Sequence, residues 1–215
     1  MVLEACIDDL KEAIIAEKNG AHQLEVCADL AHDGLTPKID LVMEIIQQVR
    51  IPIKVMIRNK YDNFHYNPDD IKVMLDDIQQ FKALKIDGFV FGALDLNESG
   101  HYILDIKTIY QICKAAHPYP VTIHKAIDQC HDLTTEAKKL NQISNVKYIL
   151  TSGGTATALI GAKTLKELQQ VVHPHSKVIA AGKITPDNLH TIAKLTGLTY
   201  FHGRKIVGDL DTNQL

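Results

Sequence analysis

Tryptophan is absent from this 215-residue chain, and neither sign of charge is in large excess. Basic and acidic side chains are interleaved and sum to a net charge of −3, so the chain lacks a basic field that could hold a nucleic-acid backbone. Long hydrophobic runs are also missing, since stretches such as 88–94 are too short to cross a bilayer. We therefore expect neither nucleic acid nor a membrane as a partner.

Cysteine is scarce, with four residues at positions 6, 27, 113 and 130 and no Cys-x-x-Cys spacing. This spacing provides neither a local metal clip nor the framework of a disulfide-rich domain. The acidic residues Glu4 and Asp8 stand close to the start, where a secretory signal would be basic and then apolar. The sequence thus predicts free thiols in the reducing cytoplasm.

The residues that are present fit one globular domain spanning 1–215. Hydrophobic residues make up 46% of the chain and charged residues 23%, as in ordinary globular proteins. Short apolar runs typical of strands alternate with segments of helical spacing. Eight strand signals lie at 2–6, 23–27, 53–57, 88–92, 120–124, 146–151, 177–181 and 199–202. Seven helix signals lie between them, at 8–19, 36–49, 67–81, 106–115, about 134–143, about 158–171 and 185–196.

The strict alternation of strands and helices predicts parallel pairing through right-handed crossovers. Eight such units close most naturally into a TIM (β/α)8 barrel, which is the fold that the sequence predicts. An open doubly wound sheet is the alternative, but the first strand-to-helix turn, Cys6–Asp9, lacks the glycine-rich dinucleotide fingerprint. In a barrel, the long connections 28–36 and 58–67 lie over the carboxyl ends of the strands, where sites are built.

Only residues 203–215 follow the last strand signal, which is too short a segment for a full helix. The eighth helix of the barrel is therefore expected to be missing or rudimentary. Outward positions on the last and first strands, including Phe201, Leu3 and Ala5, would then line a bare apolar groove. Because large exposed apolar surfaces commonly mark interfaces, we expect a two-fold homodimer with this groove at or beside the contact.

Polar side chains inside the strand segments indicate a site, because an unpaired buried charge is costly. Strand side chains alternate between faces, so Glu4 shares a face with Cys6, and Glu25 shares a face with Cys27. Their apolar neighbours fit the side that meets the helices, which turns both Glu-x-Cys pairs into the barrel. The same argument turns several later residues inward: Met56, Arg58, Thr122, His124, Thr151, Tyr200 and His202.

The glutamates are candidates for a general base, and His202 belongs to the same catalytic set. Arg58 is expected to pair with Glu4 or Glu25 and to lower the pKa of that carboxyl group. A second role for Arg58 is to clamp a bound carboxylate or phosphate through two hydrogen bonds. The alternative for the whole set is a buried ion-pair network with a structural role only.

Polar residues after two later strands extend the candidate site. His124 and Asp128 form an orienting pair if the loop between them curls back. Gly153 and Gly154 are candidates for presenting backbone N–H groups to an anion. Lys125 follows His124 directly, so strand alternation turns it away from the mouth of the barrel. The alternatives are a capping role for Asp128 and a simple chain turn at the two glycines.

Eight short motifs occur in one order: Leu-Glu-x-Cys at 3–6, Leu-Glu-Val-Cys-Ala at 24–28, Gly-Leu-Thr-Pro at 34–37, Met-Ile-Arg at 56–58, Phe-Gly-x-Leu at 91–94, Thr-Ile-His-Lys-Ala-Ile-Asp at 122–128, Leu-Thr-Ser-Gly-Gly at 150–154 and Phe-His-Gly at 201–203. Together they resemble the CutC family over residues 2–203. The resemblance implies a TIM barrel and a cytoplasmic protein of copper homeostasis. It implies no particular enzymatic activity, so two alternatives stay open: a lyase, isomerase or hydrolase, or a binding protein for a small anionic metabolite.

The resemblance directs attention to Cu(I), a soft ion that prefers thiolate and thioether ligands. Cys6 and Cys27 occupy matching positions on neighbouring strands, which lie about 4.8 Å apart. Their two sulfurs can meet one ion, with Met56 or a histidine as a further ligand. The alternative is a pair of reduced cysteines that fill space in the core. Copper homeostasis through Cu(I) binding is the function that the resemblance implies, with Cys6 and Cys27 as the metal ligands, whereas the residues by themselves favour a small-molecule site at the mouth of the barrel.

Overall fold

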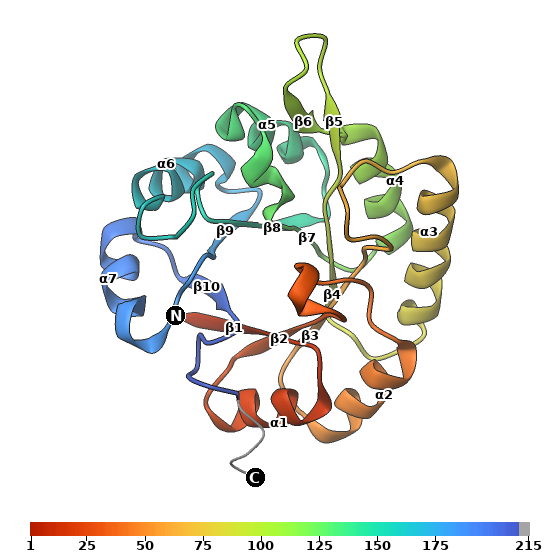
Figure 1. The fold of residues 1–215 in the computed structure, drawn as a ribbon, viewed down its shortest axis with the longest axis vertical. Helices are drawn as coiled ribbons and strands as arrows, with labels where there is room; N and C mark the ends of the chain where they lie inside the picture. Colours follow the sequence, from red (N-terminus) through yellow and green to blue (C-terminus); the bar gives the residue numbers. More distant parts are fainter. Residues whose placement is uncertain (211–215) are drawn as a thin grey trace.

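Eight parallel strands form a closed barrel at the centre of the molecule (Figure 1). The computed structural model describes residues 1–210. Around the barrel the order is β1-β2-β3-β4-β7-β8-β9-β10, and β10 pairs with β1, with His202 opposite Glu4. The strands are β1 (Val2–Ile7), β2 (Gln23–Val26), β3 (Ile53–Met56), β4 (Gly88–Phe91), β7 (Val121–Ile123), β8 (Val146–Thr151), β9 (Lys177–Ala180) and β10 (Tyr200–Gly203). The expected TIM barrel is confirmed, and the open sheet is excluded.

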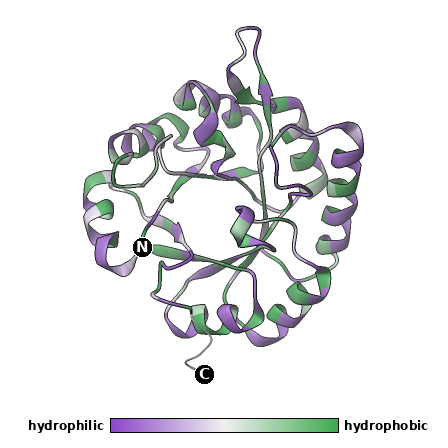
Figure 2. Cartoon of the chain, viewed as in Figure 1, coloured by the Kyte–Doolittle hydropathy of each residue, from purple (hydrophilic) through white to green (hydrophobic). Residues whose placement is uncertain are grey.

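Helices surround the barrel, and their apolar residues face it. In α4 the buried residues Ile109, Ile112, Cys113 and Ala116 recur at intervals of three and four. Figure 2 shows such patterns as alternating hydrophobic and hydrophilic bands along the helices. The α-helices of residues 1–210 are α1 (Leu10–Lys18), α2 (Ile39–Gln48), α3 (Pro68–Lys82), α4 (Ile106–Ala116), α5 (Leu133–Lys139), α6 (Ala162–Val172) and α7 (Pro186–Thr196). Three 3-10 helices join them: η1 (Leu30–His32), η2 (Lys125–Gln129) and η3 (Leu140–Gln142).

Within residues 1–210, no helix combines the length and the apolar character that a membrane crossing requires. The outward faces of the strands pack against the helices instead. Ala5, Leu24 and Val26 have no exposed surface and belong to the main core. The inward faces of the same strands are thereby left to the polar residues.

Local sequence signals set most helix starts. Asn67 caps α3 through a reciprocal capping box with Asp70, at the helix start that the sequence predicted. The start of α2 is different, because the helix begins at Ile39 and not at 36–37. The Thr36 hydroxyl is used elsewhere, since it accepts a hydrogen bond from the backbone N–H of Arg58 at 2.8 Å. This contact ties together the two long connections over the mouth of the barrel.

An antiparallel hairpin after β4 was not expected from the sequence. It consists of β5 (Leu94–Leu96) and β6 (Tyr102–Leu104), and it extends beyond the ring of helices (Figure 1). The Asn97 side chain closes its turn by accepting hydrogen bonds from the backbone N–H groups of Ser99 and His101. A polar turn between two short apolar runs is a recognised hairpin signal. This signal was overlooked because the longer strands and helices alternate so regularly.

The tail after β10 covers the place of an eighth helix. No helix follows β10 within residues 1–210, so the predicted absence is confirmed. Ile206 and Leu210 are buried in the same core as Phe201, and neither Phe201 nor Ala5 has exposed surface in a single chain. The expected bare groove is therefore wrong, and the homodimer loses the surface from which it was inferred. The end of the tail, residues 211–215, lies outside the residues that the structure describes.

Candidate functional site at the carboxyl end of the barrel

Glu4 is the most enclosed charge of the site, and β1 turns it into the barrel. One carboxylate oxygen accepts hydrogen bonds from Gln23 Nε2 at 2.6 Å and Lys54 Nζ at 2.8 Å. The other oxygen lies 2.9 Å from His202 Nδ1. All four side chains are buried. Lys54 was missed in the sequence analysis, although a lysine within the apolar run of β3 was a signal for a buried counterion.

The charges around Glu4 shift several pKa values. Burial acts to raise the pKa of Glu4, but Lys54 and His202 outweigh burial and lower that pKa to about 2. Burial dominates at Glu25 and raises its pKa to about 8, although His202 lies only 3.7 Å away. Burial acts to lower the pKa of His202, yet Glu25, Cys6 and Glu4 together raise it well above its ordinary value. His202 is therefore a cation between two carboxyl groups.

Arg58 follows β3 and holds the two long connections together. Its guanidinium group donates to the backbone oxygens of His32 at 3.1 Å, Gly34 at 3.2 Å and Tyr61 at 2.8 Å. It also stacks on Phe64, 4.5 Å from the ring centre. The side chain is buried, so these contacts fix one end of the cavity wall.

The expected pairing of Arg58 with Glu4 or Glu25 is wrong. The strand β3 ends at Met56, so the alternation of side chains between the two faces no longer applies at residue 58. Within residues 1–210, no carboxylate lies within ion-pair distance of the Arg58 guanidinium group. Arg58 is thus a buried cation without a carboxylate counterion among these residues, held by three backbone carbonyls and the Phe64 ring.

Two thiols meet beside Glu25. The Cys27 thiol donates to Glu25 at 3.5 Å, and the ligand atoms of Cys6, Cys27 and Glu25 all lie within 4.8 Å of one another. Met56 belongs to the same small cluster, and all described cysteines are free. The Cys27 thiol, as a hydrogen-bond partner, lowers the pKa of Cys6 to about 6, whereas the Cys6 contact and burial raise the pKa of Cys27. Gly34 has a φ of 86°, and a Cβ there would stand 3.2 Å from the Cys27 sulfur.

His124 is buried at the end of β7 as a neutral imidazole. Its Nδ1 accepts a hydrogen bond from the backbone N–H of Ala126 at 3.2 Å, which places the ring proton on Nε2. Among the described residues, Nε2 has no hydrogen-bond partner. Burial, and then the charge of Arg58, lower the pKa of His124 to about 3. The expected pair with Asp128 is wrong, because the Asp128 carboxylate contacts the connection after β8 instead.

Asp128 organises that connection. Its carboxylate accepts hydrogen bonds from the Thr151 hydroxyl, from the N–H and hydroxyl of Ser152, and from the N–H of Gly154. Gly153 and Gly154 have positive φ angles of 74° and 70°, and the Gly153 N–H donates to Thr151 Oγ1. Both glycine N–H groups are therefore engaged within the chain, which corrects the expectation that an anion would take them. This turn also delays the start of α6 from the expected 158 to 162.

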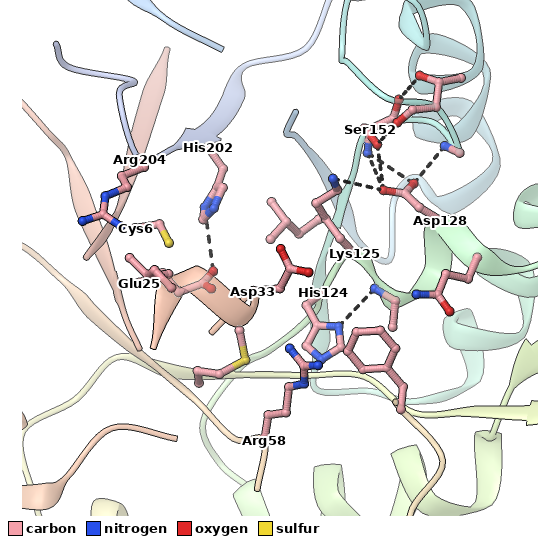
Figure 3. A pocket seen from close by; sticks show the side chains of 18 residues that line it. Cys6, Glu25, Asp33, Arg58, His124, Lys125, Asp128, Ser152, His202 and Arg204 are labelled. Carbon is pink, nitrogen blue, oxygen red and sulfur yellow. Dashed lines mark hydrogen bonds and ion pairs between the residues drawn. The ribbon is translucent and has the colours of Figure 1, made fainter. Parts of the chain in front are cut away.

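A cavity of about 480 Å³ opens at the mouth of the barrel (Figure 3). Most of the residues that were expected to converge line it, namely Cys6, Glu25, Arg58, His124 and His202. The other two expected residues, Glu4 and Cys27, contact residues that line the cavity. Glu4 lies within hydrogen-bond distance of His202, and Cys27 donates a hydrogen bond to Glu25. The barrel thus brings both Glu-x-Cys pairs to one cavity.

Two further cations line the cavity. Lys125 was expected to point away from the mouth, and this is wrong because β7 ends at Ile123 and η2 redirects the chain. Arg204 was not foreseen, and its guanidinium group donates to Glu12 at 2.7 Å. The long connections contribute Leu30, Asp33 and Phe64 to the wall, as their position over the mouth predicted.

Fold and site together define a (β/α)8-barrel protein in which buried thiol, carboxyl and imidazole groups adjoin a cavity at the carboxyl ends of the strands. Comparison with known families places this barrel more narrowly. The CutC family model matches residues 1–207, and the chain belongs to the CutC family.

Individual relatives agree with this assignment. The "Copper homeostasis protein cutC homolog" of Homo sapiens is 35% identical over 201 residues, which covers 94% of this chain and 72% of the human protein. The family protein CutC of Pasteurella multocida is 34% identical over 202 residues and covers 94% of this chain and 81% of its own length. The crystal structure of a CutC protein from Streptococcus agalactiae is 26% identical, with a TM-score of 0.87, and covers 96% of this chain and 99% of that one.

Proposed function

We propose that this protein serves copper homeostasis by binding Cu(I) as its cargo at Cys6 and Cys27. The observation that carries the proposal is the meeting of two free thiols and a carboxyl group, with all ligand atoms within 4.8 Å of one another. Two thiolates suit a soft monovalent ion, and the Met56 thioether lies in the same cluster. The names of relatives, which refer to copper homeostasis, support the same role.

The protonation state of Cys6 favours this assignment. The pKa of Cys6 is lowered to about 6, so this sulfur is a thiolate ligand near neutral pH. The pKa of Cys27 is raised, so a bound ion would have to displace its proton. The reducing cytoplasm is the compartment that we propose, because the site requires both thiols to stay reduced.

The experiment is a Cu(I) titration of the reduced protein against a competing chelator. The double variant Cys6→Ser/Cys27→Ser should lose tight binding while its circular dichroism spectrum and thermal unfolding stay close to those of the parent. The matched control is Cys113→Ser/Cys130→Ser, because these cysteines are also buried and free but lie away from the cavity. Retained affinity in the first variant, or an equal loss in the second, would contradict the proposed site.

A second candidate function is favoured by the cations around the cavity. Arg58, Lys125, His202 and Arg204 all line it, and of these Arg58 has no ion-pair partner among residues 1–210. This lining suits a small anionic metabolite, bound or converted by a lyase, isomerase or hydrolase reaction. Thermal-shift measurements with inorganic phosphate and a series of small carboxylic acids test this function, and stabilisation by none of them would exclude it.

A further inference from the structure

One wall of the cavity carries a positive charge that the chain itself leaves unbalanced. Arg58 is 3% exposed and no described carboxylate pairs with it. A buried cation without a counterion is costly, and a bound anion would remove much of that cost. The carboxylates that line the cavity are Glu25, Asp33 and Asp128. The Asp128 carboxylate already accepts hydrogen bonds from the connection after β8. Asp33 lies on an exposed turn.

The same wall holds two polar atoms without partners. Within the described chain, Arg58 Nε and His124 Nε2 are buried and make no hydrogen bond. Both carry a proton, because guanidinium is always protonated and because the bond from Ala126 to Nδ1 leaves the imidazole proton on Nε2. Unsatisfied buried donors are rare in proteins and call for an acceptor. Figure 3 shows the Arg58 guanidinium group beside the His124 ring.

We propose that this wall, formed by Arg58 and His124, binds the carboxylate group of a small monocarboxylic acid. This inference rests on the second candidate function and names its ligand class. A carboxylate brings one negative charge and two acceptor oxygens, which match one guanidinium charge and the two nitrogen donors that lack any partner. A phosphate dianion would bring more charge and more acceptors than the wall supplies.

Phe64 controls the access of the acid to the two donors. Its ring lies 4.5 Å from the Arg58 guanidinium carbon and 5.0 Å from the His124 ring centre, so it packs against both residues. Because both donors are buried and the Phe64 ring is only partly buried, we expect this ring to turn aside when an acid binds. Leu30, Met56 and Leu150 provide apolar surface for the rest of the acid.

The test is a calorimetric titration of the reduced protein with pyruvate, with lactate and, separately, with inorganic phosphate. We expect the two acids to bind and phosphate to bind more weakly or not at all. Arg58→Gln should weaken binding of the acids about ten- to hundredfold, the size of one lost charge-assisted hydrogen bond. The matched control is Arg50→Gln, because Arg50 is exposed and does not line the cavity. This control should change the affinity by less than about threefold.

A second measurement keeps the inference testable if Arg58→Gln fails to fold. In the parent protein, the Nε2–H of His124 should give a nitrogen resonance of a neutral imidazole, and pyruvate should shift it. His124→Phe keeps an aromatic ring at this position but has no ring nitrogen, so it should lose that signal and most of the affinity for the acid. If an acid binds without shifting this resonance, or if Arg58→Gln binds it as the parent does, the proposed wall is wrong while the second candidate function stands. If only phosphate binds, the ligand class is wrong, and if no anion binds, both proposals fail.

Discussion

Lys54 is the side chain that neutralises the most enclosed carboxylate of the barrel. It forms a 2.8 Å ion pair with Glu4, and both side chains are almost completely buried. Lys54→Met keeps an apolar stem but leaves Glu4 with His202 as its only cationic partner among the described residues. The free energy of unfolding should fall by up to roughly 3–5 kcal/mol, because the buried Glu4 loses one of the two cations that compensate its charge.

Urea unfolding followed by circular dichroism measures this change. Lys147→Met is the control, because Lys147 belongs to a barrel strand but is exposed to solvent. If both variants lose the same small amount of stability, Glu4 does not depend on Lys54 for its charge balance.

Glu25 makes the stability of the protein depend on pH. Its pKa is raised from 4.5 to about 8, so the folded protein holds this proton more tightly than the unfolded chain. That contribution to stability is complete below about pH 4.5 and is lost as the pH rises through about 8. Glutamine does not ionise, so in Glu25→Gln this contribution does not change with pH. The free energy of unfolding of the variant minus that of the parent should therefore rise between pH 5 and pH 8.5. The expected rise is more than about 1.4 kcal/mol, the value of one pKa unit.

Unfolding curves of parent and variant at several pH values measure this difference. The exposed residue Glu98 provides the control variant Glu98→Gln, for which the difference should not change with pH. A pH-independent difference for Glu25→Gln would mean that Glu25 is ionised in the folded protein at neutral pH.

The directions of these residues were most predictable inside the strands. Alternation placed Glu4 and Glu25 correctly in the barrel, because a strand fixes the direction of every side chain. It failed at Lys125, which follows the last residue of β7. Arg58 lines the cavity as expected, but its partners were not predicted. They include the backbone oxygens of His32 and Gly34 in a distant connection, and no local pattern encodes those contacts.

At the scale of elements, the connection between β8 and α6 depends on one carboxylate from η2. Asp128 accepts hydrogen bonds from Ser152 and Gly154, so Asp128→Ala leaves several donors without their partner. The free energy of unfolding should fall by roughly 1–3 kcal/mol. The amides of Ser152 and Gly154 should also exchange with solvent much faster, which hydrogen-exchange NMR measures.

Asp132→Ala is the matched control for this change. Asp132 is exposed and caps α5 by accepting a hydrogen bond from the Thr135 N–H. Its removal should cost about 1 kcal/mol and leave the amides at 152–154 protected. Unchanged protection in the Asp128 variant would show that the two glycines alone fix this connection.

Element types were largely predictable, and boundaries were less so. Alternating periodicity predicted all eight barrel strands, because buried parallel strands read as short apolar runs. The hairpin β5–β6 and the start of α2 were missed for different reasons. The Asn97 side chain bonds to backbone groups of its own turn, so the hairpin had a local signal that was overlooked. The Thr36 hydroxyl instead bonds to the distant backbone of Arg58, and a local reading of the sequence cannot reveal that partner.

At the scale of the whole molecule, the tail replaces an eighth helix. Ile206 is 1% exposed and packs into the main core beside the last strand. Ile206→Ala should therefore lower the free energy of unfolding by about 2–5 kcal/mol, as expected for a buried isoleucine. The control Leu195→Ala changes a residue of α7 that is 49% exposed and should have little effect.

Light scattering of the same variant also tests the assembly. The homodimer remains a prediction, and the surface that motivated it is covered by the tail. If the tail is what keeps that surface from self-association, Ile206→Ala should raise the average mass with concentration while Leu195→Ala should not. An unchanged average mass for Ile206→Ala would show that the tail does not control self-association.

Closure of the barrel joins residues that are far apart in the sequence and are therefore synthesised at different times. Glu4 and its partner His202 are separated by 198 positions. At a translation rate of about 5–20 residues per second, roughly 10–40 s pass between the synthesis of the two. During that interval β1 has no β10 to pair with, and Cys6 and Cys27 have left the ribosome without a closed barrel around them. The two thiols of the growing chain therefore have no closed barrel around them until the residues of β10 have been added.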